Sequence, residues 1–318
     1  MSKIQTFKHL WKENKRGVLV AIFNHVIHSG ILNRMSDKSF LNLTYWVHYG
    51  RFIDWKEPKT FNEKLQWLKV YNRNPEYTKM VDKYDVKEYV TNIIGDEYII
   101  PTIGVWDRIE DIPFEKLPDQ YVIKCTHDSG SVCICKDKSE FDVEKAKKKL
   151  AKGLKKNLFY WGREWPYKNV KARIIAEEYL EDDSKGEDQD LKDYKLMCFN
   201  GKVNCSFVCS DRFNNQGLKV TFFDKEWKKL PFCRHYPAAE YEIPAPLTYD
   251  KMVVLAEKLS ENIPFVRVDF YEVNGHPYFG EMTFFPGNGV EEFKPTEWDY
   301  KLGSMIDLSK VNIENDES

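Results

Sequence analysis

Alternation of apolar and polar positions, together with β-branched runs, predicts strands at six places along the chain. They cover 121–125, 131–135, 173–180, 193–209, the region near 219–232, and 266–289. The segments 193–209 and 266–289 each contain an Asn-Gly dipeptide between two apolar runs. This dipeptide is typical of tight hairpin turns, so both segments are predicted as β-hairpins.

Apolar residues three and four positions apart predict helices around and between these strands. Thr60 followed by Glu63 forms a capping box for one of them, and Gly95 is a suitable stop for another. The aromatic stretch 157–167 and the acidic stretch 182–190 are predicted as loops. Strands and hairpins alternate with helices without a strict βαβ repeat, which predicts an α+β fold. The helices cover 18–32, 59–72, 81–94, 143–156 and 248–261.

The last predicted hairpin carries Arg267, Asp269 and Glu281 within apolar runs. A charge that faces a core is costly unless it is paired or bound to something. Side chains alternate along a strand, so the length of the connecting loop decides which residues share a face. A two-residue turn pairs Val273 with His276, separates the two carboxylates onto opposite faces, and predicts no metal site.

A three-residue loop over 274–276 places Asp269 opposite Glu281 and Arg267 opposite Thr283 instead. Two opposed carboxylates repel each other unless a cation lies between them. Oxygen ligands of this kind suit Mg²⁺ shared with phosphates. Both registers remain open from the hairpin alone. In the three-residue register the other face suits a core and consists of Val266, Val268, Phe270, Tyr278, Met282 and Phe284.

The composition is that of a globular protein and excludes some classes of partner. The chain has 318 residues, enough for two or three domains, with 42% hydrophobic and 31% charged residues. Its net charge of −2 gives no basis for nucleic-acid binding. The seven cysteines are an odd number without a disulfide framework, so we expect reduced thiols in a cytoplasmic protein.

The segment 18–32 follows a basic stretch and superficially resembles a signal peptide. Its apolar run is interrupted by Asn24, His25 and His28, and it is too short to span a bilayer. We expect an amphipathic helix that packs on the body or lies on a membrane surface, with both histidines on the helix surface.

Two lysines stand within apolar strands. Lys124 ends one strand immediately before a small loop, 126–130, whose backbone amides can surround phosphate oxygens. Lys195 lies inside a hairpin strand between Tyr194 and Leu196. A single lysine in an apolar strand can be explained by a long side chain that extends its ammonium group to solvent. Two of them beside an acidic hairpin indicate an anion-binding site.

These segments resemble the ATP-grasp ligases. Lys124 and the loop after it resemble the phosphate-covering lid, in which Ser129, Gly130 and Ser131 would surround phosphate. The spacing Asp82-Lys83…Lys87 resembles the helix whose last lysine, Lys87, reaches a phosphate of ATP.

The strand IIAEEYL resembles the segment that reads adenine. Glu177 would accept a hydrogen bond from the exocyclic amine, and backbone groups around Glu178 and Leu180 would bond the ring edge. Glu181 and Asp183 are the candidates for the acid that binds the ribose hydroxyls.

Asp269 and Glu281 match the Mg²⁺-binding carboxylates of ATP-grasp enzymes, and Arg267 matches the basic residue before the first of them. Many of these enzymes continue as Glu-x-Asn, whereas this chain reads Glu281-Met282-Thr283. The third metal ligand would therefore be Thr283 or Asn288.

More narrowly, the chain resembles the TupA-like ATP-grasp family of bacterial polysaccharide clusters, related to teichuronopeptide synthesis. The resemblance implies two α+β subdomains that clamp ATP, preceded by a mostly helical N-terminal segment. The segments that carry it span about 60 to about 308 and are TFNEKLQWLK, DKYDVKEYV, YVIKCTHDSGS, EEYL, DYKLMCFNGKV, RVDFY and YFGEMTFFPGNG. The boundaries we expect are a helical segment at 1–75, a central region at 76–118, the lid subdomain at 119–182, the catalytic subdomain at 183–308 and a disordered tail at 309–318.

The resemblance implies a carboxylate–amine ligase with ATP and Mg²⁺ as cofactors. ATP would phosphorylate a carboxylate, and an amine would attack the acyl phosphate. Lys195 would hold phosphate and Arg267 would steady the transferring group, so catalysis is positioning and electrostatics. The family implies that an amino acid or other amine is joined to a uronic-acid carboxylate of a capsule or cell-surface polysaccharide precursor. Candidates for the acceptor pocket are Arg212, His235 and the aromatic loop.

Three other functions remain open. Proteins of this kind are often labelled glycosyltransferases, in which a sugar nucleotide and Mn²⁺ would use Glu181, Asp182 and Asp183; this leaves Lys124 and Lys195 without a role. A kinase-like phosphotransferase would use the same clamp and keep the phosphate on its product. A non-catalytic sugar-binding module with a decayed nucleotide site is the third.

Overall fold

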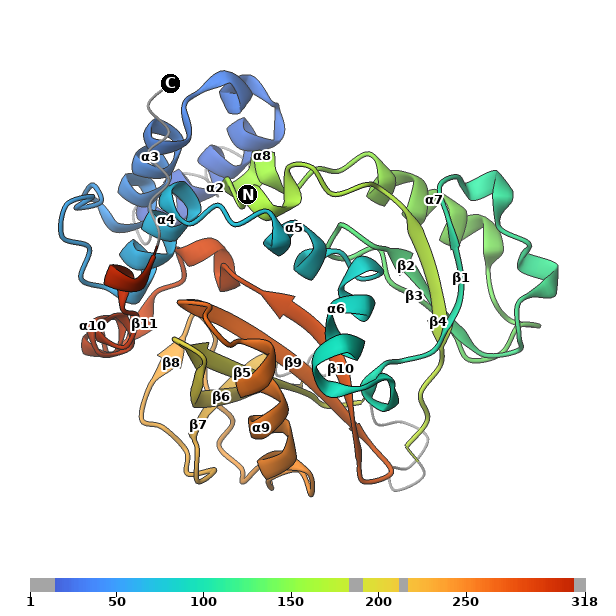
Figure 1. Cartoon of the computed structure of the whole chain (residues 1–318). Coiled ribbons are helices and arrows are strands. Elements are labelled where there is room, and N and C mark those ends of the chain that lie inside the picture. The colour runs from blue at the N-terminus through green and yellow to red at the C-terminus, as the bar shows by residue number, and fades with distance from the viewer. Residues whose placement is uncertain (1–14, 183–190, 212–216, 312–318) are drawn as a thin grey trace, which may run out of the picture.

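The fold is described by a computed structural model that covers residues 15–182, 191–211 and 217–311 (Figure 1). It contains two antiparallel sheets of four and five strands, a two-stranded ribbon, and helices around them. The hydrophobic core divides into three clusters: one under the four-stranded sheet, one on the five-stranded sheet, and one among the N-terminal helices. The predicted α+β architecture is confirmed.

The N-terminal region is helical and packs on itself. Helix α2 (Lys15–His28) buries Phe23 and Ile27 against α3 (Asp37–Tyr49), while His25 and His28 stay exposed as predicted. No helix among the described residues is long and apolar enough to cross a membrane. Helix α4 (Phe61–Tyr71) begins at Thr60, and the predicted capping box with Glu63 is present.

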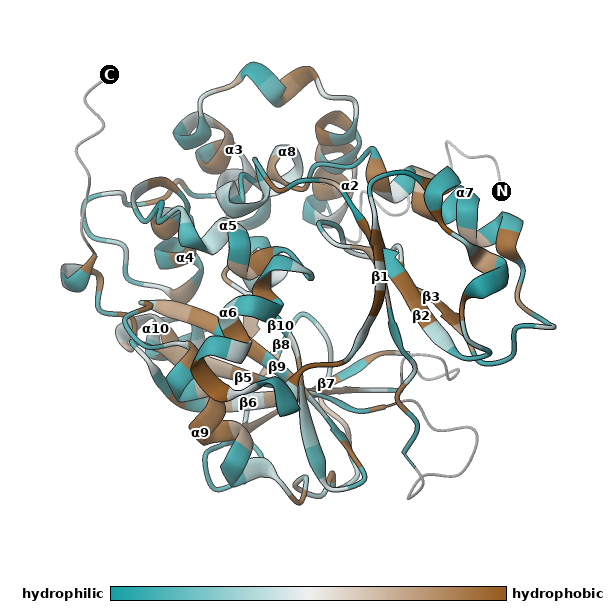
Figure 2. Ribbon diagram, turned by 45° about the vertical axis from the view of Figure 1, so that its right-hand side comes forward, coloured by the Kyte–Doolittle hydropathy of each residue, from teal (hydrophilic) through white to brown (hydrophobic). Residues whose placement is uncertain are grey.

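The small sheet has the order β1-β4-β2-β3. The helix α7 (Val143–Leu154) covers one face of it and buries Ala146 and Leu150. In Figure 2 strands β2 and β3 are largely hydrophobic, whereas the lysine-rich α7 is largely hydrophilic. The first strand comes from the region before residue 119, so the sheet begins earlier in the chain than the predicted lid segment. The strands are β1 (Thr102–Trp106), β2 (Tyr121–Cys125), β3 (Cys133–Cys135) and β4 (Ile174–Glu178).

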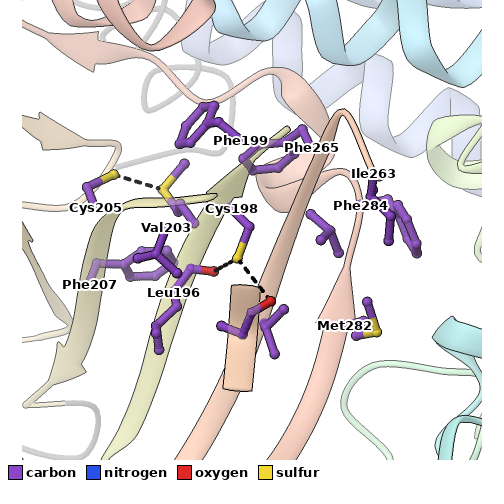
Figure 3. Packing of buried hydrophobic residues seen from close by; sticks show 14 of the residues in the cluster. Leu196, Cys198, Phe199, Val203, Cys205, Phe207, Ile263, Phe265, Met282 and Phe284 are labelled. Carbon is purple, nitrogen blue, oxygen red and sulfur yellow. Dashed lines mark hydrogen bonds between the residues drawn. The ribbon is translucent and has the colours of Figure 1, made fainter. Parts of the chain in front are cut away.

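The large sheet has the order β10-β9-β5-β6-β7 and is antiparallel throughout. Its core face packs on α9 (Tyr249–Leu259), where the Cys198 thiol lies 3.9 Å from the carbonyl oxygen of Ala256 (Figure 3). The ribbon of β8 (Cys233–Arg234) and β11 (Phe293–Lys294) lies beside β7, and α10 (Glu297–Ser304) follows it. The five strands are β5 (Asp193–Phe199), β6 (Lys202–Ser210), β7 (Lys219–Asp224), β9 (Phe265–Val273) and β10 (His276–Thr283).

Two predicted elements differ from the structure. The single helix expected over 81–94 is two helices, α5 (Glu76–Val81) and α6 (Asp85–Ile94), because Asp82 turns its carboxylate back onto the chain. Its Oδ1 accepts hydrogen bonds from the amides of Tyr84 and Asp85 at 2.8 and 3.0 Å. Such a bond competes with helix continuation, so the chain breaks there.

The aromatic stretch expected as a loop contains the short helix α8 (Phe159–Gly162) and a 3₁₀ turn. It leaves the small sheet and packs against the N-terminal helices. Arg163 is buried there and donates to the carbonyl oxygens of Leu32, Asn33 and Met35 at 2.9, 3.2 and 3.1 Å. The connection between α7 and β4 is therefore attached to the N-terminal region.

All seven cysteines are unpaired, as expected for reduced thiols, and among the described parts of the chain no three His, Cys, Asp or Glu side chains gather as a metal site.

We expect Thr60→Ala to lower the free energy of unfolding by about 1–2 kcal/mol, because a buried helix cap is lost. Urea denaturation measures this. The matched control is Thr296→Ala, at the start of α10, whose side chain makes no capping hydrogen bond. Equal losses in both variants would contradict the importance of the cap.

We expect the free energy of unfolding to fall as the pH drops from about 6.5 toward about 4, in part through His48. Burial, together with the nearby Arg16, lowers the pKa of His48 from 6.5 to about 4. The unfolded chain therefore binds a proton in this window that the folded chain does not. Protonation of His48 lowers the free energy of unfolding within the window and has no effect above it. His48→Gln should flatten the pH dependence of denaturation, whereas His25→Gln on the helix surface should leave it unchanged.

Candidate active site

The hairpin that raised the question of register turns through two residues. Asn274 and Gly275 have φ values of 51° and 71°, and Val273 pairs with His276. These dihedrals fit a type I′ turn, which matches the twist of the strands. The three-residue loop that would have aligned the carboxylates is therefore wrong.

The alignment of the carboxylates is nevertheless the one that the longer loop predicted. A β-bulge at Gly280 inserts one extra residue into β10, so that Asp269 pairs with Glu281 and Arg267 with Thr283. A Cβ at Gly280 would lie only 3.2 Å from the carbonyl oxygen of Asp269. The absence of a side chain allows the bulge to form.

The two-residue turn decides which aromatic residue joins the core. Between the turn and the bulge, Phe279 pairs with Phe270 and is buried, whereas Tyr278, which we expected in the core, is only partly buried. Beyond the bulge, Met282 and Phe284 are buried as predicted.

A cluster of alternating charges covers the other face of the large sheet. The Arg267 guanidinium bridges the two carboxylates: its Nη2 lies 2.7 Å from both Asp269 Oδ2 and Glu281 Oε1. The Lys195 ammonium lies 2.5 Å from Asp269 Oδ2 and 2.5 Å from Asp193 Oδ2. Asp269 is only 1% exposed, so its charge depends on these partners.

The pKa values in this cluster reflect burial opposed by neighbouring charges. Burial raises the pKa of Asp269 to about 6, although Arg267 and Lys195 act to lower it. Burial also acts to raise the pKa of Glu281, but Arg267 and then Lys195 bring it down to about 2. Glu281 is therefore ionised at every pH at which the protein would work.

The donor set fits a small hard cation. Asp269 and Glu281 present oxygen atoms to one point, and a guanidinium already lies between them. Thr283 Oγ1 lies 3.3 Å from Glu281 Oε1 and adds a neutral oxygen. Two carboxylates and a hydroxyl suit Mg²⁺ when phosphate oxygens complete the shell.

Asn288, the other candidate for the third ligand, is held elsewhere. Its Oδ1 accepts a hydrogen bond from the buried Lys69 ammonium at 2.5 Å, and its carbonyl oxygen accepts from Lys69 and Gln66 at 2.9 Å each. The turn that contains it follows β10 and is thus fastened to α4.

A second cluster lies on the small sheet. Glu177 forms ion pairs with Lys87, at 2.6 Å, and with Lys124. Lys87 also donates to the carbonyl oxygen of Ile100 at 2.6 Å and to Thr102 Oγ1 at 2.8 Å. Burial acts to raise the pKa of Glu177, but the two lysines lower it overall.

Lys83 joins the two clusters, and the sequence analysis did not select it. Its ammonium donates to the carbonyl oxygen of Asp128 at 2.7 Å. Burial lowers its pKa, which nearby Glu281 raises. The helix break at 82–84 turns Lys83 inward. The prediction of one continuous helix over 81–94 therefore gave no reason to select this residue. It lines a small cavity with Lys87, Lys124, Glu177, Ile99, Ile100, Phe279 and Gly280.

The loop after Lys124 is held by the residues around the helix break. Asp82 Oδ2 accepts a hydrogen bond from Thr126 Oγ1 at 2.9 Å, and the amide of Lys83 donates to the carbonyl oxygen of Thr126 at 3.0 Å. The Ser131 hydroxyl is used within the loop, where it donates to Asp128 Oδ1 at 2.5 Å. Ser129 and Gly130 form the exposed tip, and Gly130 has a φ of 96°.

The remaining predicted residues lie apart from these clusters. The backbone amide of Glu178 donates to the carbonyl oxygen of Pro101 at 3.1 Å, and Leu180 lies just beyond the end of β4. His235 lies next to the β8–β11 ribbon, and its amide donates to the carbonyl oxygen of Glu292. Asp183 and Arg212 lie outside the described residues.

Comparison with known proteins identifies the family. The model of the family described as TupA-like ATPgrasp matches residues 63–307, most of the chain. The chain belongs to the TupA-like ATP-grasp family. The resemblance drawn from the sequence motifs is confirmed. A comparison with curated proteins gave no match.

Solved structures similar to this TupA-like ATP-grasp protein are distant. D-alanine–D-alanine ligase from Bacillus anthracis, complexed with ATP, shares 16% identity over 71% of this chain and 64% of its own, with a TM-score of 0.39. The ATP-grasp ligase PsnB, complexed with a phosphomimetic variant of a minimal precursor, Mg and ADP, shares 10% identity over 79% of this chain and 66% of its own, with a TM-score of 0.41. The TupA-like protein thus spans less than two thirds of the length of both.

We expect Arg267→Met to lower the free energy of unfolding by about 3–5 kcal/mol, because two carboxylates lose the cation between them. Mg²⁺ should restore part of this loss, since it can take the place of the guanidinium. Chemical denaturation with and without Mg²⁺ measures both effects. Arg108→Met is the control, because it removes only an exposed ion pair with Asp111. A variant insensitive to Mg²⁺ would contradict the proposed metal position.

Proposed function

We propose that this chain is an ATP- and Mg²⁺-dependent carboxylate–amine ligase that acts through an acyl phosphate. The observation that supports it is the meeting of the lysine cluster and the bulged hairpin at one cavity. Lys83, Lys87 and Lys124 lie on one side, and Phe279 and Gly280, which precede the carboxylate pair on β10, lie on the other. A nucleotide triphosphate with its metal carries the charges that such a pair of clusters would neutralise.

On the nucleotide side, Lys83, Lys87 and Lys124 bind phosphate oxygens, and the loop at Ser129, Gly130 and Ser131 covers them. Glu177 holds both Lys87 and Lys124 in the structure described here, so arriving phosphates compete with Glu177 for these ammonium groups. The freed Glu177 carboxylate then accepts from the exocyclic amine of adenine, and backbone groups of Glu178 and Leu180 bond the ring edge.

On the metal side, Asp269, Glu281 and Thr283 would hold Mg²⁺. The ion would offset the charge of the transferring phosphoryl group. Arg267 is displaced from its bridging position toward the acid substrate, and Lys195 keeps Asp269 ionised and oriented.

The two steps follow from ordinary acyl transfer. A carboxylate oxygen of the acid attacks the γ-phosphorus. The bond between the γ-phosphorus and the oxygen that bridges to the β-phosphate breaks, and ADP leaves. The amine nitrogen then attacks the acyl carbon, phosphate leaves, and the nitrogen loses a proton. Arg267 and Lys195 neutralise the charge that develops on the oxygens in both steps, so no protein nucleophile is required.

For the substrates, we infer an amino acid or other amine and a uronic-acid-containing saccharide of the bacterial capsule or cell surface. This rests on the TupA-like family to which the chain belongs. The reaction would take place in the cytoplasm, where ATP is available. The N-terminal helices would allow contact with the inner face of the membrane, and nucleic acid is not a partner.

The test is isothermal titration with a non-hydrolysable ATP analogue and Mg²⁺. We expect micromolar binding to the unmodified protein. Lys124→Ala should weaken it by about tenfold or more, because a charge-assisted hydrogen bond is lost. The double variant Asp269→Asn/Glu281→Gln should bind without dependence on Mg²⁺.

Lys147→Ala is the control, since Lys147 lies on the exposed face of α7 in an ion pair with Glu144. Absence of binding at millimolar analogue would overturn the ATP clamp. With ATP in place of the analogue, amine-dependent release of ADP would separate a ligase from a phosphotransferase.

A further inference from the structure

Arg234 is a buried arginine with an unused hydrogen-bond donor. It ends β8 and is only 6% exposed. Its Nε forms an ion pair with Glu291 Oε2 at 2.8 Å. Its Nη1 has no hydrogen-bond partner among residues 15–182, 191–211 and 217–311. Burial lowers the pKa of Arg234, and only Glu291 offsets this strongly.

An unpaired buried donor is uncommon in folded proteins and costs stability. A guanidinium carries donors only, so a group that satisfies it must be an acceptor. The planar edge of a guanidinium matches the two oxygens of a carboxylate. An ammonium group is itself a donor and cannot fill this position.

The position of Arg234 relates it to the proposed site. Its guanidinium carbon lies 5.1 Å from the centre of the Phe207 ring, and that of Arg267 lies 5.8 Å from the same ring. Phe207 pairs with Lys195 across β5 and β6, so its ring rises from the face that carries the charge cluster. Arg234 therefore belongs to the same layer of side chains.

The strand order separates Arg234 from the nucleotide side. The lysine cavity includes Phe279 and Gly280 of β10, at one edge of the large sheet. The carboxylate pair follows on β10 and β9, and Arg234 lies over Phe207 and Phe222 of β6 and β7. A phosphoryl group that moves from ATP to an acid needs the acid on the side of the γ-phosphorus away from ADP. Arg234 lies beyond the carboxylate pair, away from the lysine cavity.

We propose that Arg234 and Phe207 bind the carboxylate of the acid substrate beside Arg267. This inference rests on the proposed ligase function and adds the position of its acid. The guanidinium of Arg234 fixes the carboxylate oxygens, and the ring of Phe207 excludes water beneath them. Glu291 occupies part of the guanidinium edge and competes with the substrate.

The test is saturation-transfer NMR with D-glucuronate as the probe, in the presence and absence of the ATP analogue and Mg²⁺. D-glucose is the neutral control, acetate tests the carboxylate alone, and inorganic phosphate tests displacement by a different oxyanion. We expect glucuronate to bind and glucose to fail. Arg234→Met should weaken glucuronate by about tenfold or more, since a charge-assisted pair is lost. Arg234→Lys should bind at an intermediate level.

Glu291→Gln provides a test of opposite sign. Removing the resident carboxylate should strengthen glucuronate binding, an effect that a merely structural role of Arg234 would not produce. It also keeps the proposal testable if Arg234→Met unfolds, which thermal denaturation would reveal. Arg108→Met is the matched arginine control and should bind as the unmodified protein does.

The outcomes separate this inference from the proposed function. Equal glucuronate binding in Arg234→Met and the unmodified protein, weaker binding in Glu291→Gln, or binding of glucose as well as glucuronate would overturn the acid site. So would absence of glucuronate binding to an unmodified protein that binds the analogue. Displacement of glucuronate by phosphate more strongly than by acetate would assign Arg234 to a phosphate and overturn the carboxylate. Failure of the analogue to bind overturns the ATP clamp, whatever glucuronate does.

Discussion

The pairing of the buried carboxylates Asp269 and Glu177 with cations is the constraint on which the site depends. Arg267 stands between Asp269 and Glu281, and Glu177 stands between Lys87 and Lys124. A buried carboxylate would be costly without such a partner. The protein thus holds opposite charges close together, and under the proposed function nucleotide and metal would replace these partners.

The bulge at Gly280 makes this arrangement possible. A regular β10 after the two-residue turn would have turned Glu281 to the opposite face from Asp269. One extra residue restores the shared face while leaving the tight turn intact. The tight turn, and not the bulge, places Phe279 in the core in place of Tyr278. The register next to the turn and the register beyond the bulge are thus set independently.

Much of the fold could be predicted because it depends on local patterns. The capping box at Thr60, the strand YVIKC and the Asn-Gly hairpins follow from spacing and turn chemistry. The helix break at Asp82 was missed although its signal is local, since an aspartate that accepts from the amides of Tyr84 and Asp85 favours a helix start there. Lys83 was missed with it. The shared carboxylate face is the one that the three-residue loop would have given, but it is produced by a later bulge, about which a turn signal says nothing.

The attachment of Arg163 affects where an independently folding unit begins. The family match starts at residue 63, yet three carbonyl acceptors of this buried guanidinium lie between residues 32 and 35. A chain shortened to the matched region would keep the arginine and lose its acceptors, together with the Phe40 ring beneath it. The region matched by the family is therefore shorter than the region needed to satisfy the hydrogen bonds of Arg163, which extends back to residue 32. The helices before residue 63 form part of the scaffold that carries the connection between α7 and β4.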